Sequence, residues 1–84
     1  MPWVYILKSV SYKKTYTGST ADLERRLTEH NAGWSVFSSR YRPWVIVYRE
    51  EYPTLEEARK REKYLKSSAG RRFIKNNKLI LFNL

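Results

Sequence analysis

The chain has 84 residues, with 17 Lys and Arg against 8 Asp and Glu, a formal net charge of +9, and no cysteine. A chain of this length buries roughly 60% of its unfolded surface, so we expect one domain, residues 1–84, with a thin core. The absence of cysteine excludes disulfides and thiolate metal sites, and the single histidine excludes a zinc site with several histidines. An apolar content of 42% is too high for a disordered chain, so a folded surface carries the charge.

Most of the excess positive charge belongs to the last third of the chain. Residues 1–57 carry 8 basic and 7 acidic side chains, whereas residues 58–84 carry 9 basic side chains and 1 acidic one. This asymmetry is typical of a surface that binds a polyanion, and equally typical of a solvated helix face. No apolar run reaches the ~18 residues of a membrane span and no signal peptide is evident, so we expect a cytoplasmic protein that binds no membrane.

Three short segments rich in β-branched and aromatic residues predict strands. Residues 3–7 are continuously apolar, which is typical of a strand buried on both faces. Residues 15–17 follow after a polar stretch of hairpin length, which predicts antiparallel pairing and places Tyr5 near Tyr16. Residues 44–48 predict the third strand.

The first helix is predicted between the second and third strands. Ser19 or Thr20 is its expected N-cap, and acidic residues in its first turn favour the positive end of the helix dipole. We expect this helix to end near residues 31–33. Residues 33–43 then predict a polar and aromatic loop.

Two further helices are predicted after the third strand. Residues 54–57 have capping-box spacing and open a helix that runs to about Lys66. Residues 67–70 break that helix, a short basic helix follows over residues 71–76, and an apolar tail at 79–84 is expected against the sheet edge. The element order predicts an α+β fold in which a small three-stranded antiparallel sheet is flanked by helices.

Glu62 is a polar residue within the apolar stripe of the helix that follows the third strand. At about 100° per residue it lies on the same side as Leu55 and Leu65. One interpretation is a carboxylate at the rim of the core, paired with Arg59 or Lys66. The other is a cleft-facing ligand of a divalent cation, because magnesium prefers carboxylate oxygens.

Arg26 and His30 flank the apolar stripe of the first helix in the same way. A lone histidine in such a place is often bonded to a backbone carbonyl, and an arginine often covers apolar surface with its stem. Their co-occurrence with Tyr5, Tyr16 and Glu62 favours function, because these side chain types are the parts that a phosphodiesterase needs.

These residues resemble the motifs of the GIY-YIG endonuclease family, in particular its small single-domain bacterial members. The family's Gly-Ile-Tyr motif matches residues 3–5 and its Tyr-Ile-Gly motif matches residues 16–18. The catalytic arginine of the family falls on Arg26, the following histidine on His30, and the metal-binding glutamate on Glu62. The resemblance covers nearly the whole chain and implies a GIY-YIG nuclease-like fold.

The sequence departs from the family pattern at three positions. Trp3 replaces the first motif glycine and Thr17 replaces the isoleucine, but both tyrosines are intact. Ser19 occupies a position where some family nucleases carry a lysine that assists the general base.

The resemblance implies hydrolysis of DNA phosphodiesters with one Mg²⁺ or Mn²⁺ ion, in DNA repair or recombination. Tyr16 would be the general base or its relay, and because a phenol has a pKa of about 10 it needs the metal or Arg26 nearby. Tyr5 would orient the water or the phosphate, and His30 would relay a proton from Tyr16. Arg26 would stabilise the transition-state charge, and Glu62 would bind the metal.

Basic side chains near these positions are candidate contacts to the nucleic-acid backbone. They are Arg25, Arg40, Arg42, Arg59, Lys63, Lys66, Arg71, Arg72 and Lys75. Trp34, Phe37 and Tyr41 of the predicted loop either stack beside a base or pack in the core.

Two other functions are compatible with the sequence. A non-catalytic nucleic-acid-binding module is suggested by Ser19 and by the lack of a separate targeting domain. A small interaction protein would use its charge for solubility alone. A protein partner that targets the domain is compatible with either activity.

Overall fold

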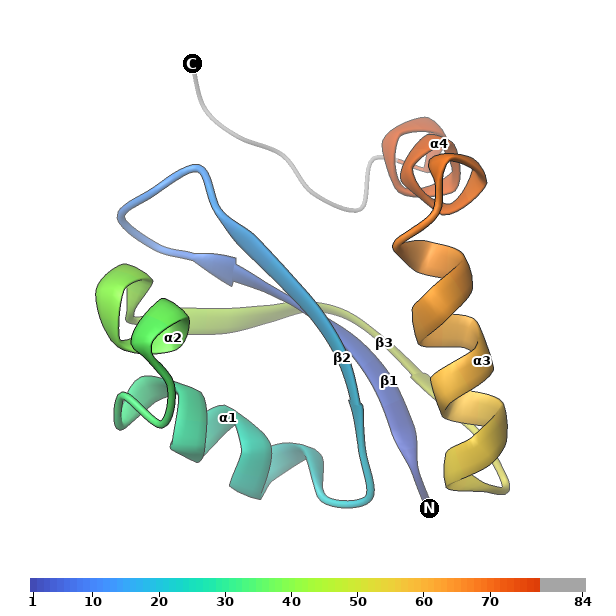
Figure 1. Ribbon diagram of the computed structural model, residues 1–84, viewed down its shortest axis with the longest axis horizontal. Helices are drawn as coiled ribbons and strands as arrows, with labels where there is room; N and C mark the ends of the chain where they lie inside the picture. The colour runs from blue at the N-terminus through green and yellow to red at the C-terminus, as the bar shows by residue number, and fades with distance from the viewer. Residues whose placement is uncertain (78–84) are drawn as a thin grey trace.

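The computed structural model describes residues 1–77, which form a three-stranded antiparallel sheet with helices on both faces (Figure 1). The predicted α+β fold is confirmed. No helix in this range is long and apolar enough to cross a bilayer. The elements in chain order are β1 (Trp3–Ser9), β2 (Thr15–Thr20), α1 (Leu23–Asn31), α2 (Val36–Tyr41), β3 (Trp44–Glu51), α3 (Leu55–Leu65) and α4 (Ser68–Asn76).

The strand order is β2-β1-β3, so β1 lies in the centre of the sheet and β2 and β3 form its edges. Residues 4–7 of β1 are at most 1% exposed, and their side chains alternate between two cores. Tyr5 and Leu7 pack with Leu23 and Trp44, on the face that α1 and α2 cover. Val4 and Ile6 pack with Leu65, on the face of α3 and α4 (Figure 1). The prediction of a strand buried on both faces is therefore confirmed.

The prediction that Ser19 or Thr20 caps the first helix is wrong. β2 continues to Thr20, two strand positions beyond Gly18, so the chain is still extended at both residues. Asp22 is the N-cap of α1, and its carboxylate accepts a hydrogen bond from the Arg25 N–H at 3.1 Å. An aspartate at this position also favours the positive end of the helix dipole.

The prediction that residues 33–43 form a loop is also wrong, because this segment contains α2. Ser35 caps the helix and Ser38 occupies the third helical position, where its hydroxyl oxygen accepts a hydrogen bond from the Ser35 N–H at 3.1 Å. This is a capping box with serine in the place of the usual glutamate. The Trp44 indole donates to the Ser38 carbonyl at 3.0 Å and ties α2 to β3.

The last helix begins earlier than residues 71–76. Ser67 caps α4 by accepting from the Gly70 N–H at 3.2 Å, so residues 67–70 form its first turn. A Cβ atom on Gly70 would lie 2.1 Å from the Tyr64 carbonyl oxygen and 2.4 Å from the Leu65 Cα. Glycine thus lets α4 start against the end of α3. The predicted tail at 79–84 lies outside the described residues.

An ion pair fixes α3 on β3. Glu50 of β3 accepts from the Arg61 Nε at 2.9 Å and from its second nitrogen at 3.2 Å, and also from the hydroxyls of Tyr48 and Tyr52. Burial alone would raise the pKa of Glu50, but these hydrogen bonds outweigh it and hold the pKa below its ordinary value. The guanidinium of Arg61 also lies 4.9 Å from the Phe73 ring of α4. Arg61 of α3 therefore contacts both β3 and α4.

Substitution of Gly70 by alanine should destabilise the protein by about 1–3 kcal/mol, because backbone atoms cannot yield to the added methyl as a flexible side chain would. Urea unfolding followed by circular dichroism measures this change. The exposed neighbour Ser68 provides the control: Ser68→Ala should change stability by no more than about 0.5 kcal/mol. Equal stability of Gly70→Ala and the wild type would contradict the close approach of α3 and α4.

Candidate active site

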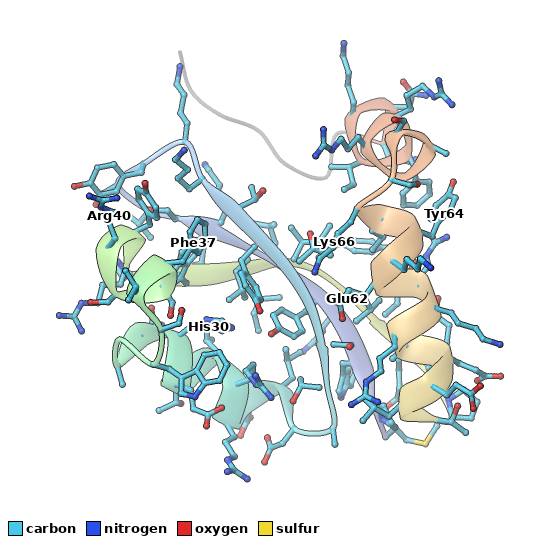
Figure 2. The ribbon with its side chains drawn as sticks, viewed as in Figure 1. His30, Phe37, Arg40, Glu62, Tyr64 and Lys66 are labelled. Carbon is cyan, nitrogen blue, oxygen red and sulfur yellow. The ribbon has the colours of Figure 1, made fainter. Side chains whose placement is uncertain are left out.

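Two hollows lie along the open edge of β2, between the two layers of helices. The first has a volume of about 310 Å³ and lies between α1 and α3. Its lining includes Ser19, Arg25, Arg26, Glu29, Trp34 and Arg59. The second has a volume of about 410 Å³ and reaches α2 and α4. Its lining includes Tyr16, Phe37, Lys66 and Arg71. Figure 2 shows Glu62 of α3 and Lys66 at the C-cap of that helix extending towards β2, and His30 extending from α1 towards the sheet.

Tyr5, Tyr16 and His30 form a cluster on the α1 side of the sheet. The Tyr5 ring stacks on Tyr16 with centroids 6.2 Å apart, as the predicted hairpin requires. His30 is fully buried, its ring centroid lies 4.6 Å from that of Tyr16, and its Nε2 is hydrogen-bonded to the Tyr5 hydroxyl at 3.3 Å. His30 Nδ1 has no hydrogen-bond partner within residues 1–77. One interpretation of His30, a bond to a backbone carbonyl, does not hold for Nε2, which is bonded to a phenol instead.

Burial sets the protonation states of Tyr5 and His30. It raises the pKa of the Tyr5 hydroxyl well above its ordinary value, and Tyr16 adds to the rise while Arg26 opposes it. Burial also lowers the pKa of His30 below its ordinary value, and the positive charge of Arg26 lowers it further. At neutral pH Tyr5 is therefore a protonated phenol and His30 a neutral imidazole.

Gly18 allows the two tyrosines to lie together. β1 and β2 pair in a register that places Tyr5 opposite Gly18. A Cβ atom on Gly18 would lie 2.6 Å from the Tyr5 hydroxyl oxygen and 2.9 Å from the Tyr16 ring. Any side chain here would displace one of the phenols.

Arg26 lies in the first hollow, next to this cluster. Its Nε is 3.4 Å from a carboxylate oxygen of Glu29, and its guanidinium is 5.1 Å from the centroid of the Trp34 ring. Arg26 and Glu62 both influence the pKa of Tyr5, Arg26 lowering it and Glu62 raising it. Side chains from α1 and α3 thus act on the same phenol of β1.

Glu62 is held between β2 and its own helix. The Ser19 hydroxyl donates to Oε1 at 2.5 Å, and the Lys66 ammonium donates to Oε2 at 2.7 Å. The pairing with Lys66 that the helical spacing allowed is therefore present. The carboxylate also faces β2, as the interpretation as a cleft-facing ligand requires.

The side chains around Glu62 fit a divalent cation that takes a single protein carboxylate. Residues 1–77 contain no group of three or more His, Asp or Glu side chains that could hold a metal ion, which excludes an all-protein cage in this part of the chain. A magnesium ion commonly takes one or two carboxylates and completes its shell with water and substrate phosphate. Glu62 with the adjacent Ser19 hydroxyl meets that requirement once Lys66 releases Oε2.

The predicted nucleic-acid contacts divide into several groups. Arg25 and Arg59 line the first hollow and Lys66 and Arg71 line the second, so these four lie beside the candidate catalytic residues. Lys63 on α3 and Arg72 and Lys75 on α4 are exposed and line neither of these two hollows. Arg40 and Arg42 belong to α2 and its C-cap, and Figure 2 shows Arg40 at the end of the molecule away from α3.

The three aromatic residues of the predicted loop have different environments. Tyr41 packs against the core, with its ring centroid 5.1 Å from that of Phe37. The Phe37 ring centroid lies 6.2 Å from that of Tyr16, and Phe37 lines the second hollow. Trp34 remains 55% exposed in the first hollow.

Glu29, Ser19 and Trp34 also lie within the site, and of these the sequence offered only Trp34, as one candidate for stacking beside a base. Glu29 could have been found, because its spacing of three from Arg26 places both on one helix face. The bond from Ser19 to Glu62 has no sequence signal, since 43 positions separate them. The contact of Trp34 with Arg26 depends on the turn after α1.

The chain is similar to known proteins over most of its length. The model of the GIY-YIG catalytic domain matches residues 1–77. A UPF0213 protein of Staphylococcus haemolyticus is 35% identical over 74 residues, which cover 87% of this chain and 89% of that protein. A UPF0213 protein of Clostridium perfringens is 38% identical over 84 residues, covering 99% and 84%.

A solved structure has the same fold. The solution NMR structure of a UPF0213 protein from Bacillus halodurans superposes with a TM-score of 0.52 at 32% identity, covering 93% of this chain and 86% of that one. The family match spans every described residue, and the relatives match over most of their own length. The resemblance seen in the motifs is thereby confirmed, and the chain belongs to the GIY-YIG nuclease family.

Proposed function

We propose that this protein is a metal-dependent endonuclease that hydrolyses phosphodiester bonds of DNA. The observation that carries the proposal is the convergence of Tyr5, Tyr16, Arg26, His30 and Glu62 on the open edge of β2, where the two hollows leave room for a nucleic-acid strand. Four basic side chains line these hollows and suit contacts to the phosphates on either side. A role in DNA repair or recombination and an action in the cytoplasm are part of the same proposal.

The side chains divide the chemistry between them. Tyr16 is half-buried and lines the second hollow, and its ring centroid lies 4.6 Å from that of His30. Once the phenol proton has passed to His30, the Tyr16 phenolate can take a proton from an attacking water. Tyr5 stays protonated and orients the water or the phosphate through its hydroxyl. The neutral His30 is hydrogen-bonded through Nε2 to the Tyr5 hydroxyl and holds that hydroxyl in place. Arg26 binds a non-bridging oxygen and stabilises the charge that builds up on it.

Glu62, with the Ser19 hydroxyl beside it, would hold one Mg²⁺ or Mn²⁺ ion. Such an ion supplies Lewis-acid stabilisation of the leaving oxygen when bound. Lys66, which donates to Oε2, would give up that contact if Glu62 held a cation, and its ammonium could then contact a phosphate of the substrate.

A second candidate function is a nucleic-acid-binding module without catalysis. The specific observation in its favour is that Ser19 and Lys66 satisfy both oxygens of Glu62. In that case the carboxylate would orient a basic side chain rather than bind a cation. The two candidate functions predict different effects on DNA cleavage when the charge of the Glu62 carboxylate is removed.

Glu62→Gln should reduce the rate of DNA cleavage more than about 100-fold. Loss of a residue that only supports a metal ligand typically costs about 10- to 100-fold in activity, and loss of the ligand itself should cost more. DNA affinity without added metal should stay the same or rise, because a negative charge is removed. The assay is cleavage of duplex, nicked, branched and single-stranded DNA with Mg²⁺ or Mn²⁺, followed by titration of the same DNA without metal.

Glu57 is a matched control because it is an exposed glutamate at the start of the same helix. Glu57→Gln should cleave at the wild-type rate. Cleavage by Glu62→Gln at that rate would refute a metal role for Glu62. A wild-type protein that binds all these substrates and cuts none would support the binding module.

Tyr16→Phe removes one hydroxyl and leaves the ring packing in place. The variant should lose about 10²- to 10⁴-fold in cleavage rate, the usual contribution of a general base, with DNA affinity nearly unchanged. Single-turnover cleavage measures the chemical step directly. Tyr12→Phe, at an exposed tyrosine of the β1–β2 connection, is the control and should have no effect. A wild-type rate for Tyr16→Phe would exclude this phenol as the base.

Stability should fall as the pH drops below about 6.5, because the unfolded chain then binds a proton at His30 and the folded chain does not. The slope is at most about 1.4 kcal/mol per pH unit and ends at the lowered folded pKa. Urea unfolding between about pH 7 and about pH 5 checks this. His30→Gln should lack this slope, and an identical pH dependence in both proteins would contradict a neutral buried His30.

A further inference from the structure

Trp34 is a large aromatic side chain that stays open to solvent within the candidate active site. It is 55% exposed and lines the first hollow together with Arg25, Arg26 and Arg59. The other two tryptophans of the chain, Trp3 and Trp44, both pack in the core beneath the sheet. The chain thus leaves one indole outside the core, at the place where a nucleic-acid strand would pass.

The orientation of the Trp34 ring is held from two sides. The Arg26 guanidinium lies 5.1 Å from the ring centroid, and the buried His30 ring packs nearly perpendicular to it at 5.8 Å and 83°. A ring that is already ordered loses little conformational freedom when a ligand stacks on it. Its exposed surface is therefore a preformed platform for a planar partner.

The volume and charge of the first hollow indicate which planar ligand it can bind. About 310 Å³ is at the lower end of the range for small-ligand pockets, about 300–1,000 Å³, so it admits one nucleoside rather than a duplex. Within residues 1–77 Arg59 makes no ion pair, and the pair between Arg25 and Glu29 is long at 3.8 Å. Both arginines are thus available to the phosphates that flank such a nucleoside.

The contact between Trp34 and Arg26 places this platform next to the phosphodiester bond that the proposed nuclease would cut. If Arg26 binds an oxygen of the cut phosphate, the Trp34 ring lies next to that phosphate, within reach of a base one sugar away. A base in a duplex faces its partner strand and cannot turn to the ring without unpairing, which costs a few kcal/mol. An unpaired base can stack at once.

We propose that the hollow between α1 and α3 binds one unpaired nucleobase against the Trp34 ring, so that the strand is cut beside an unpaired nucleotide. This inference rests on the proposed function and specifies the substrate class of the same site. The platform recognises the flat face of the base, so it tolerates any base sequence.

The test is the affinity of Trp34→Ala for a short single-stranded oligodeoxynucleotide and for a fully paired duplex, measured without divalent cations so that nothing is cut. Loss of one stacked base should weaken single-strand binding roughly 5- to 150-fold. Duplex binding should change less than about 2-fold, because it depends on phosphate contacts. Trp34→Phe keeps a flat ring and should restore most of the single-strand affinity.

Tyr64 is a matched control, because it also is an exposed aromatic, 39%, with an arginine 4.9 Å from its ring. Figure 2 shows it on the side of α3 away from β2. Tyr64→Ala should leave both affinities unchanged. Equal losses for single strand and duplex in Trp34→Ala, or no loss for the single strand, would overturn the proposal.

The binding assay and the cleavage assay separate the two ways in which the proposals can fail. Wild-type cleavage of DNA together with unaltered single-strand binding by Trp34→Ala overturns the nucleobase site and leaves the nuclease. Selective loss of single-strand binding in Trp34→Ala, together with no cleavage by the wild type on any substrate with either metal, supports the nucleobase site and refutes the nuclease.

Discussion

The burial of both faces of β1 is the constraint on which the rest of the structure depends. A chain of 84 residues has little surface to bury, and a central strand whose residues 4–7 face no solvent contributes all of these side chains to packing. Tyr5 is one of these side chains, so its hydroxyl is placed in the protein interior beneath the edge strand β2. Burial then requires a polar partner, which His30 supplies from α1. The central strand and the candidate site are therefore built from the same residues.

The helix that carries Glu62 is fixed by contacts on two of its sides. Arg61 binds Glu50 of β3 with two nitrogens, and the adjacent Glu62 accepts from Ser19 of β2. A rotation of α3 about its axis would therefore break at least one of these two interactions. Charged hydrogen bonds of this kind are stronger than neutral ones, and the two nitrogens of Arg61 add a definite direction. The ion pair at β3 thus helps to hold the Glu62 carboxylate over β2 on the opposite edge of the sheet.

Charge is arranged along the open edge of β2 rather than spread evenly. Arg25, Arg26 and Arg59 line one hollow, and Lys66 and Arg71 line the other. These residues come from α1, α3 and α4 and from the segment between α3 and α4, so no single helix makes the basic surface. Negative charge within it is confined to side chains that already have partners: Glu62 with Lys66, Glu29 with Arg26, and Asp22 at the cap of α1. The electrostatic surface suits an anionic strand that passes across both hollows.

Local periodicity and motifs at short spacings were enough to predict the α+β fold, the central apolar strand, the tyrosine hairpin and the family. The sequence also identified Glu62, Arg26 and His30 as polar residues on apolar helix faces. It missed α2, since a serine replaced the glutamate of the usual capping box, and it misplaced the start of α4, since Gly70 reads as a helix breaker until α3 is seen beside it. Only the tertiary structure decided which partners these polar residues have. The bonds of Glu62 to Ser19 and of His30 to Tyr5, and the place of Trp34 in the first hollow, depend on how separate elements pack, which no local pattern encodes.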